Sequence, residues 1–183
     1  MVRTTAALAV ITAAFAAPQA LAGASDAYTL VLKGADGPNE ITISLDGMAD
    51  EYVIRANGTI DPTETCSNPP GDPNELRCPE DDIVGFTVRA RGGNDDIIVK
   101  DSVAVSTILN GGAGLDDLVG GSNTDRLVGG DDDDVLVGRG GSDLLYGNNG
   151  RDVLRGGAGK DVLRGGPGRD VLHGGPDRDD VRQ

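Results

Sequence analysis

A nine-residue repeat is the feature that most restricts how this chain can fold. Eight consecutive blocks of nine run from Gly111 to Arg182 without an insertion, as in "GGAGKDVLR" and "GGPGRDVLH". Position 1 of every block is glycine, position 6 is aspartate, and position 8 is leucine except in the last block, which has valine. Helices repeat near 3.6 residues and strands at 2, so neither period explains nine. A fixed period of this kind indicates a solenoid.

The pattern inside each block predicts the type of solenoid. Positions 1 to 6 are typical of a turn, and positions 7 to 9, such as "VLR" and "LLY", of a very short strand. Position 4 is glycine except at Asn123, Asp132 and Asp177, and Asn and Asp tolerate positive φ best after glycine. We therefore expect positive φ at position 4, an inward leucine at position 8, and two blocks per coil. The predicted fold is all-β, a parallel β-roll with leucines between two columns of turns.

The aspartates at position 6 predict a bound cation. In such a roll, blocks n and n+2 stack on the same side, which places their carboxylates about 5 Å apart, the strand spacing. Two carboxylates at that distance repel by roughly 3 kcal/mol at an effective dielectric constant near 20. A column of them therefore needs a cation between coils, and carboxylate and carbonyl oxygens suit Ca²⁺ better than Mg²⁺. One histidine and two cysteines provide no ligand set for Zn²⁺.

The blocks "GGAGLDDLV" (111–119) and "GGAGKDVLR" (156–164) resemble the hemolysin-type, or RTX, nonapeptide G-G-x-G-x-D-x-(large apolar)-x. The resemblance implies that each Ca²⁺ lies between turns n and n+2, held by position 6 carboxylates and glycine-turn carbonyls. The carboxylate ligands that it implies are Asp116, Asp125, Asp134, Asp143, Asp152, Asp161, Asp170 and Asp179, with Asp95 from an imperfect half-repeat at 92–99. The implied glycine ligands are Gly111, Gly112, Gly114, Gly129, Gly130, Gly147, Gly150, Gly156, Gly157, Gly159, Gly165, Gly166 and Gly168.

The implied aspartate pairs allow up to about six calcium ions. The pairs are Asp116/Asp134, Asp125/Asp143, Asp134/Asp152, Asp143/Asp161, Asp152/Asp170 and Asp161/Asp179. Two blocks depart from the family pattern: "GGDDDDVLV" (129–137) has Asp132 at the turn glycine, and "GRGGSDLLY" (138–146) has Arg139 at position 2. A guanidinium at position 2 would compete with an ion for the neighbouring carboxylates. The sites at these two turns are therefore the weaker predictions.

The N-terminal residues predict export. Arg3 precedes the apolar run "AALAVITAAFAA" (6–17), and "ALA" (20–22) precedes Gly23. A basic start, a short apolar run and a small-residue cleavage site are typical of a signal peptide, here residues 1–22. The run is shorter than the roughly 20 residues of a membrane-spanning helix. We therefore expect a secreted protein that is not inserted in a membrane after cleavage.

Residues 23–91 predict a β-rich N-terminal cap that continues into a roll over 92–183. Segments such as "YTLVLKG" (28–34) and "NEITISLDG" (39–47) alternate apolar and polar residues between turn-forming stretches. A solenoid needs a cap of this kind at its end. In an exported protein, Cys66 and Cys78 are expected to form one disulfide.

Charge and the absence of a catalytic pattern narrow the function. The formal net charge of −14 argues against nucleic acid as a partner. We predict no enzyme, because no nucleophile has a histidine partner in sequence context. The predicted function is an extracellular calcium-binding protein whose repeats fold on Ca²⁺ binding. The alternatives are a calcium-stiffened surface or adhesion module and, less favoured, the repeat-bearing remnant of a secreted enzyme. An acidic cell-surface glycan or neighbouring Asp side chains could meet the basic residues at position 5, which are Arg151, Lys160, Arg169 and Arg178.

Overall fold

The computed structural model describes residues 11–16, 28–34, 36–57, 60–61, 66–80 and 83–183. These residues contain no α-helix, so the all-β prediction is confirmed. Accordingly, the described residues include no helix that is long and apolar enough to cross a membrane. Most of the predicted signal peptide lies outside the described residues.

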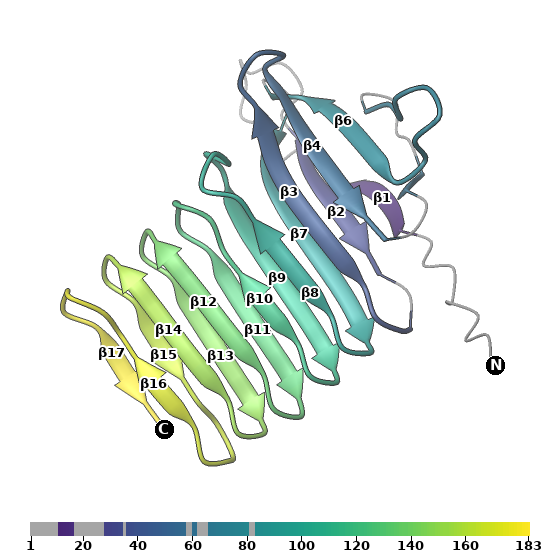
Figure 1. Cartoon of the computed structure of the whole chain (residues 1–183). Helices are drawn as coiled ribbons and strands as arrows, with labels where there is room; N and C mark the ends of the chain where they lie inside the picture. The colour runs from purple at the N-terminus through teal and green to yellow at the C-terminus, as the bar shows by residue number, and fades with distance from the viewer. Residues whose placement is uncertain (1–10, 17–27, 35, 58–59, 62–65, 81–82) are drawn as a thin grey trace.

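Two sheets form the structure (Figure 1). The first has nine strands in the spatial order β17 (Asp180–Arg182), β15 (Val162–Arg164), β13 (Leu144–Asn149), β11 (Arg126–Asp131), β9 (Ser106–Ala113), β7 (Ile83–Gly92), β2 (Tyr28–Lys33), β1 (Ile11–Ala16) and β5 (Ile60–Asp61). The second has eight strands in the order β16 (Val171–His173), β14 (Val153–Ala158), β12 (Val135–Gly140), β10 (Asp117–Val119), β8 (Asp96–Val99), β3 (Glu40–Asp46), β4 (Glu51–Ala56) and β6 (Glu75–Pro79).

The strands of the repeat region stack in parallel, one coil on the next. The chain alternates between the two sheets, so that β10 pairs with β12 and β11 pairs with β13. In this register Leu118 lies opposite Leu136, and Leu136 lies opposite Leu154. Each step is two nine-residue blocks, which confirms the predicted parallel β-roll with two blocks per coil. Figure 1 shows the resulting ladder of short strands, from teal to yellow along the chain.

The core between the sheets is a ladder of aliphatic side chains. Most of the position 8 leucines are completely buried, which confirms that they point inward. The ladder weakens at β16 and β17, where Leu172 is only partly buried and Val181 is 42% exposed, because these are the edge strands. The fully buried members in the repeats are Leu118, Leu127, Leu136, Leu145, Leu154 and Leu163.

The same stacking extends toward the N-terminus. β2 pairs in parallel with β7, and β3 pairs in parallel with β8. Strand pairing therefore runs through the expected cap boundary at residues 91 and 92 without a break. Beyond β3, the strands β4 and β6 continue the second sheet in antiparallel order. The predicted disulfide between Cys66 and Cys78 is present there, with both cysteines buried.

One strand falls within the predicted signal peptide. Residues 11–16 form β1, which pairs antiparallel with β2 and parallel with the two-residue strand β5. This pairing describes the uncleaved chain. The prediction that residues 1–22 are removed stays a prediction.

Candidate metal sites in the turns

The turns between strands form two columns along the roll. The first turn column contains 90–95, 111–116, 129–134, 147–152 and 165–170, which follow strands of the nine-stranded sheet. The second turn column contains 120–125, 138–143, 156–161 and 174–179, which follow strands of the eight-stranded sheet. Because alternate blocks occupy opposite columns, the position 6 aspartates divide between the two. Four of the repeat aspartates lie in each column, and Asp95 lies in the first.

A ladder of hydrogen bonds joins the position 6 aspartates within each column. The backbone N–H of each donates to Oδ1 of the aspartate one coil later, as from Asp116 to Asp134 at 2.9 Å. The same bond joins Asp125 to Asp143 at 2.8 Å. All six pairs expected from the sequence are in direct contact in this way, as are Asp95 and Asp116. The ladder fixes the orientation of every carboxylate that accepts such a bond.

The second oxygen of most of these carboxylates is buried without a partner. These are the Oδ2 atoms of Asp95, Asp116, Asp134, Asp143, Asp152 and Asp161. A buried polar atom without a hydrogen bond costs about 1–3 kcal/mol, and more when it is charged. The arrangement therefore calls for a proton or a cation at each unpartnered oxygen.

Burial also changes the acidity of these groups. Desolvation raises the pKa of Asp134 and of Asp143 to about 7, and that of Asp116 to about 6. The backbone hydrogen bond at Oδ1 opposes this rise, and neighbouring carboxylates add to it. Burial likewise raises the pKa of Asp152 and Asp161. If these aspartates were all ionised at neutral pH, their burial and mutual repulsion would destabilise the folded turns unless a cation were added.

Glycine at position 1 leaves a space that is lined by oxygens. A Cβ at Gly147 would collide with Oδ2 of Asp152 and would stand 2.8 Å from the carbonyl oxygen of Gly165, one coil later. The other predicted position 1 glycines, Gly111, Gly129, Gly156 and Gly165, face the carboxylate of their own block in the same way. The unpartnered carboxylate oxygens and this cradle together fit a hard cation with oxygen ligands.

Most residues at positions 2 and 4 of the turns have positive φ, although Gly121 at position 2 does not. Asp132 at position 4 has φ of 78°, as expected, but Asn123 and Asp177 do not have positive φ, so the expectation fails at those two turns. A Cβ on Gly130 would collide with the carbonyl oxygen of Gly112, which shows how closely successive turns stack. The predicted position 2 and 4 glycines all have positive φ: Gly112, Gly114, Gly130, Gly150, Gly157, Gly159, Gly166 and Gly168.

Local contacts explain the two exceptions at position 4. Asp177 lies in the last turn and uses its own Oδ2 to accept a bond from the N–H of Gly159, at 2.9 Å. Asn123 belongs to the turn 120–125, which has a repeat turn on one side and an irregular turn on the other. There Gly121 faces Val99 and Val103.

The sequence analysis did not identify one turn of the first column. The stretch "GADGPN" (34–39) has the spacing of a repeat turn, since Gly34 and Asn39 are as far apart as Gly111 and Asp116. Asn39 takes the place of the aspartate, and its N–H and Nδ2 both donate to Oδ1 of Asp95 at 2.7 Å. That equal spacing is the sequence signal that could have identified this turn.

The second column begins with an irregular turn. Thr107 lies where the aspartate would be, and its N–H and Oγ1 donate to Oδ1 of Asp125 at 2.7 and 2.8 Å. The irregular turn lengthens its coil. Asp95 and Asp116, which lie one coil apart in the first column, are separated by 21 residues instead of 18. The insertion includes Val103, which is buried.

Arg139 does not contact the position 6 carboxylates, contrary to expectation. Its Nη1 donates to the carbonyl oxygens of Val99 at 2.7 Å and Gly120 at 3.2 Å, and to Oδ1 of Asp101 at 2.8 Å. The side chain lies along the second column and crosses the neighbouring coil. The reason is that two carbonyl oxygens and the carboxylate of Asp101 in the preceding coils accept its hydrogen bonds.

The basic residues at position 5 do not form a single row. Arg151 and Arg169 belong to the first turn column, and Lys160 and Arg178 to the second. Arg151 is also paired with Asp133, with 2.9 Å between Nη2 and Oδ2. A continuous cationic stripe for an acidic glycan is therefore not present.

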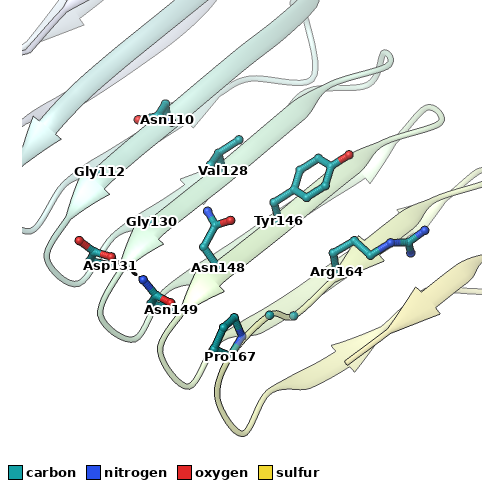
Figure 2. Close-up of a pocket in the computed structure, with 12 residues that line it drawn as sticks. Asn110, Gly112, Val128, Gly130, Asp131, Tyr146, Asn148, Asn149, Arg164 and Pro167 are labelled. Carbon is teal, nitrogen blue, oxygen red and sulfur yellow. Dashed lines mark hydrogen bonds between the residues drawn. The ribbon is translucent and has the colours of Figure 1, made fainter.

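A shallow groove lies on the outer face of the nine-stranded sheet (Figure 2). It has a volume of about 520 Å³ and crosses several coils, and the glycines at position 2 leave its floor open. Tyr146 and Arg164 project from neighbouring strands, with Asn148 and Asn149 toward the turns (Figure 2). Arg126 stacks over the Tyr146 ring, 5.3 Å from its centroid.

No group of three or more His, Cys, Asp or Glu side chains gathers among the described residues. A hard cation in the turns would have carboxylate and backbone carbonyl oxygens within reach, which are the ligands that Ca²⁺ takes.

The fold and the oxygen-lined turns define a β-roll that is suited to hard cations. The family model of the RTX calcium-binding nonapeptide repeat matches the chain in four copies, over residues 110–145, 119–154 and 146–181. The chain therefore carries RTX calcium-binding nonapeptide repeats, and calcium binding is the function that these repeats imply. No curated protein and no solved structure matches the chain.

Proposed function

We propose that this is an extracellular calcium-binding protein whose repeat region folds when Ca²⁺ enters the turns. The observation that carries the proposal is the row of buried Oδ2 atoms without a partner in each turn column. Calcium ions would be held by the position 6 aspartates and by turn carbonyls, up to about six in number. The proposal gives the protein no catalytic activity.

The residues of the chain prepare these turns for an ion. The amide–Oδ1 ladder orients each carboxylate, and the position 1 glycines leave room beside its second oxygen. The leucine ladder excludes water from the space between the columns. Calcium supplies the positive charge that the buried carboxylates lack, so the free energy of binding contributes directly to folding.

Export would control when the roll folds. The signal peptide that the sequence predicts over residues 1–22 supports secretion. In a compartment with little free calcium, repulsion between carboxylates would keep residues 111–182 unfolded. Calcium sites of extracellular modules have dissociation constants of about 10⁻⁴–10⁻³ M, so extracellular calcium would fold the roll.

Circular dichroism of the secreted protein tests this function. We expect β signal to appear on adding Ca²⁺, with a midpoint at about 10⁻⁴–10⁻³ M, and Mg²⁺ at the same concentration to have little effect. Identical spectra in chelator and in calcium would exclude calcium-dependent folding. Mass spectrometry of the secreted protein should give an N-terminus at or near Gly23, and a protein that still contained Met1 would exclude signal cleavage.

A surface or adhesion module is the second candidate, and the groove favours it. An aromatic ring, amides and one guanidinium, that of Arg164, line this open trough, and groups of these kinds bind an acidic oligosaccharide (Figure 2). Binding of uronate-containing oligosaccharides to the calcium-loaded protein should weaken on Tyr146→Ala. Arg155→Ala is the control, because Arg155 occupies the corresponding block position on the other sheet. Equal loss in both variants, or no binding by the unmodified protein, would exclude the groove.

A further inference from the structure

The outer face of the eight-stranded sheet carries a band of aliphatic side chains. Along β8, β10, β12, β14 and β16 the position 8 residue points into the core, so the residues on either side of it point outward. Outward residues of neighbouring strands lie opposite each other, as Val119 lies opposite Val137. None of the aliphatic ones is fully buried, and Val171 is 48% exposed. The aliphatic band consists of Ile98, Val119, Val135, Val137, Val153 and Val171.

The aliphatic band crosses this face diagonally. Its members at position 9 lie on β8, β10 and β12, toward the N-terminus, and are Ile98, Val119 and Val137. Its members at position 7 lie on β12, β14 and β16, toward the C-terminus, and are Val135, Val153 and Val171. The two rows overlap at β12, so Val135 and Val137 stand at the centre of the band.

Charged side chains occupy the two corners that the band leaves free. Asp96 and Asp117 lie opposite each other at position 7 of β8 and β10, and form an acidic corner. Arg155 and His173 lie opposite each other at position 9 of β14 and β16, and form a basic corner. All four side chains are exposed. The acidic and basic corners therefore lie on opposite sides of the aliphatic band.

This pattern is complementary to itself. Rotating a second copy of the chain by 180° about an axis along the aliphatic band places band on band. The same rotation places the acidic corner of each copy on the basic corner of the other. Strands of the two sheets then cross at a steep angle, close to the orthogonal arrangement in which sheets pack face to face. A two-fold contact of this kind is the commonest interface of homo-oligomers.

We propose that two folded chains associate through this face, with their aliphatic bands in contact and Asp117 of each copy beside Arg155 of the other. The contact of the bands removes apolar surface from water, and the corners set the orientation of the two copies. The face is small, so the dimer is weak and reversible.

Calcium links this dimer to the proposed function, on which the inference rests for its calcium dependence. The face exists only when the repeat strands are stacked, so calcium-dependent folding creates it. Up to about six bound calcium ions would also offset most of the formal net charge of −14. Repulsion between two copies is thereby reduced in the calcium-loaded protein.

Sedimentation velocity in saturating calcium tests the dimer over a range of protein concentrations. The unmodified chain should shift from monomer to dimer as its concentration rises. Val137→Lys should remain monomeric at the same concentrations, because it places an unpaired charge at the centre of the contact. The matched control is Val128→Lys, since Val128 has the same block position and is also half-buried, but lies on the nine-stranded sheet. It should dimerise as the unmodified chain does, and circular dichroism checks that both variants are folded.

Exchanging charges between copies tests the orientation. Asp117→Lys and Arg155→Glu should each weaken dimerisation, because each brings like charges together across the contact. An equimolar mixture of the two variants should recover the dimer, because each pair across the mixed contact again has opposite charges. A salt bridge within one chain cannot be restored by mixing, so recovery assigns the pair to two copies.

Three results would overturn this inference and leave the proposed function intact. They are a folded protein that stays monomeric at every concentration, equal loss of dimer in Val137→Lys and Val128→Lys, and a mixture that does not recover. A folded monomer that instead sediments with phosphatidylcholine vesicles would assign the face to a membrane and would also overturn the dimer. A protein that is folded and dimeric in chelator would overturn calcium-dependent folding and leave the dimer.

Discussion

The backbone N–H of Asp116 donates a hydrogen bond to Oδ1 of Asp134, which follows it by 18 residues, at 2.9 Å. This bond connects neighbouring coils through a side chain as well as through the sheets. It uses one carboxylate oxygen and leaves the other, Oδ2 of Asp134, buried without a partner. The same aspartate thus serves two purposes: one oxygen sets the stacking of the coils, and the other is available to a cation.

Substituting an interior aspartate should separate these two purposes. Asp152→Asn keeps an oxygen to accept the bond from Asp134, and its amide nitrogen would replace the unpartnered Oδ2. We therefore expect more β signal in chelator, because a buried charge without a partner is replaced by a neutral amide that can donate to the carbonyl oxygen of Gly165, which lines the same space. Calcium-induced folding should become weaker and less cooperative.

The control for Asp152→Asn is Asp179→Asn in the last turn. Asp179 also accepts a bond through Oδ1, from Asp161, but it is less buried than Asp152 and no later turn stacks on it. Calcium titrations followed by circular dichroism should show the larger loss for Asp152→Asn. Equal losses would contradict the sharing of carboxylates between successive turns.

Adding a methyl group at position 1 should close a calcium site. In Gly147→Ala the new Cβ would collide with Oδ2 of Asp152, and the carbonyl of Gly165 would stand 2.8 Å away. We expect the variant to need several-fold more calcium to fold, because the methyl group occupies the space beside the carboxylate. Gly140→Ala is the control, since its nearest neighbour would be 3.7 Å away. A calcium midpoint that moves equally in both variants would argue against a site at position 1.

The period of nine was sufficient to predict the roll. Leucine at position 8 and glycine at position 1 recur in register, and only stacked coils place every such leucine in one core. Pairing of aspartates such as Asp134 and Asp152 followed from the same register, because blocks n and n+2 share a column. The glycines of the turns predicted positive φ at position 4 but not at position 2. Position 2 was identified only by the structure, through Arg139 and Asn148.

Features that depend on a single contact could not be predicted from the period. Asn39 and Thr107 occupy the aspartate position in two turns whose sequences have lost the glycine pair. Each donates to Oδ1 of a neighbouring aspartate from its backbone and from a neutral side chain, so the ladder continues where the repeat sequence does not. The direction of the Arg139 side chain likewise depends on the irregular coil that contains Val99, which lies 40 residues earlier in the chain.

The leucine ladder should make stability depend on the position of a substitution along the roll. Leu145 is fully buried between neighbouring coils, so Leu145→Ala should cost about 2–5 kcal/mol in the calcium-loaded protein. Leu172 lies in the edge strand β16 and is partly buried, so Leu172→Ala should cost clearly less. Urea unfolding in saturating calcium measures both free energies. Equal costs would show that the last coil is covered by something other than solvent.

Acid should partly substitute for calcium. The pKa values of Asp134 and Asp143 are raised by burial from 3.8 to about 7, and that of Asp116 to about 6. Between pH 3.8 and about pH 7, these aspartates bind more protons in the folded, calcium-free roll than in the unfolded chain. Its stability is therefore greatest below about pH 4 and is lost as the pH rises toward 7. In chelator, the β signal of the repeat region in circular dichroism should thus be greater at pH 5 than at pH 8.

The calcium-loaded protein should show the opposite dependence on pH. Protons and Ca²⁺ compete for the same carboxylates, so the calcium concentration at the folding midpoint should rise as the pH falls from 8 to 6. Asp134→Asn removes one of the two groups whose pKa is raised most, and it should flatten both pH dependences. Circular dichroism at fixed ionic strength measures them in one series of titrations. A calcium-free roll that became more stable as the pH rose from 4 to 7 would contradict the raised pKa values, and with them the burial of unpaired carboxylates.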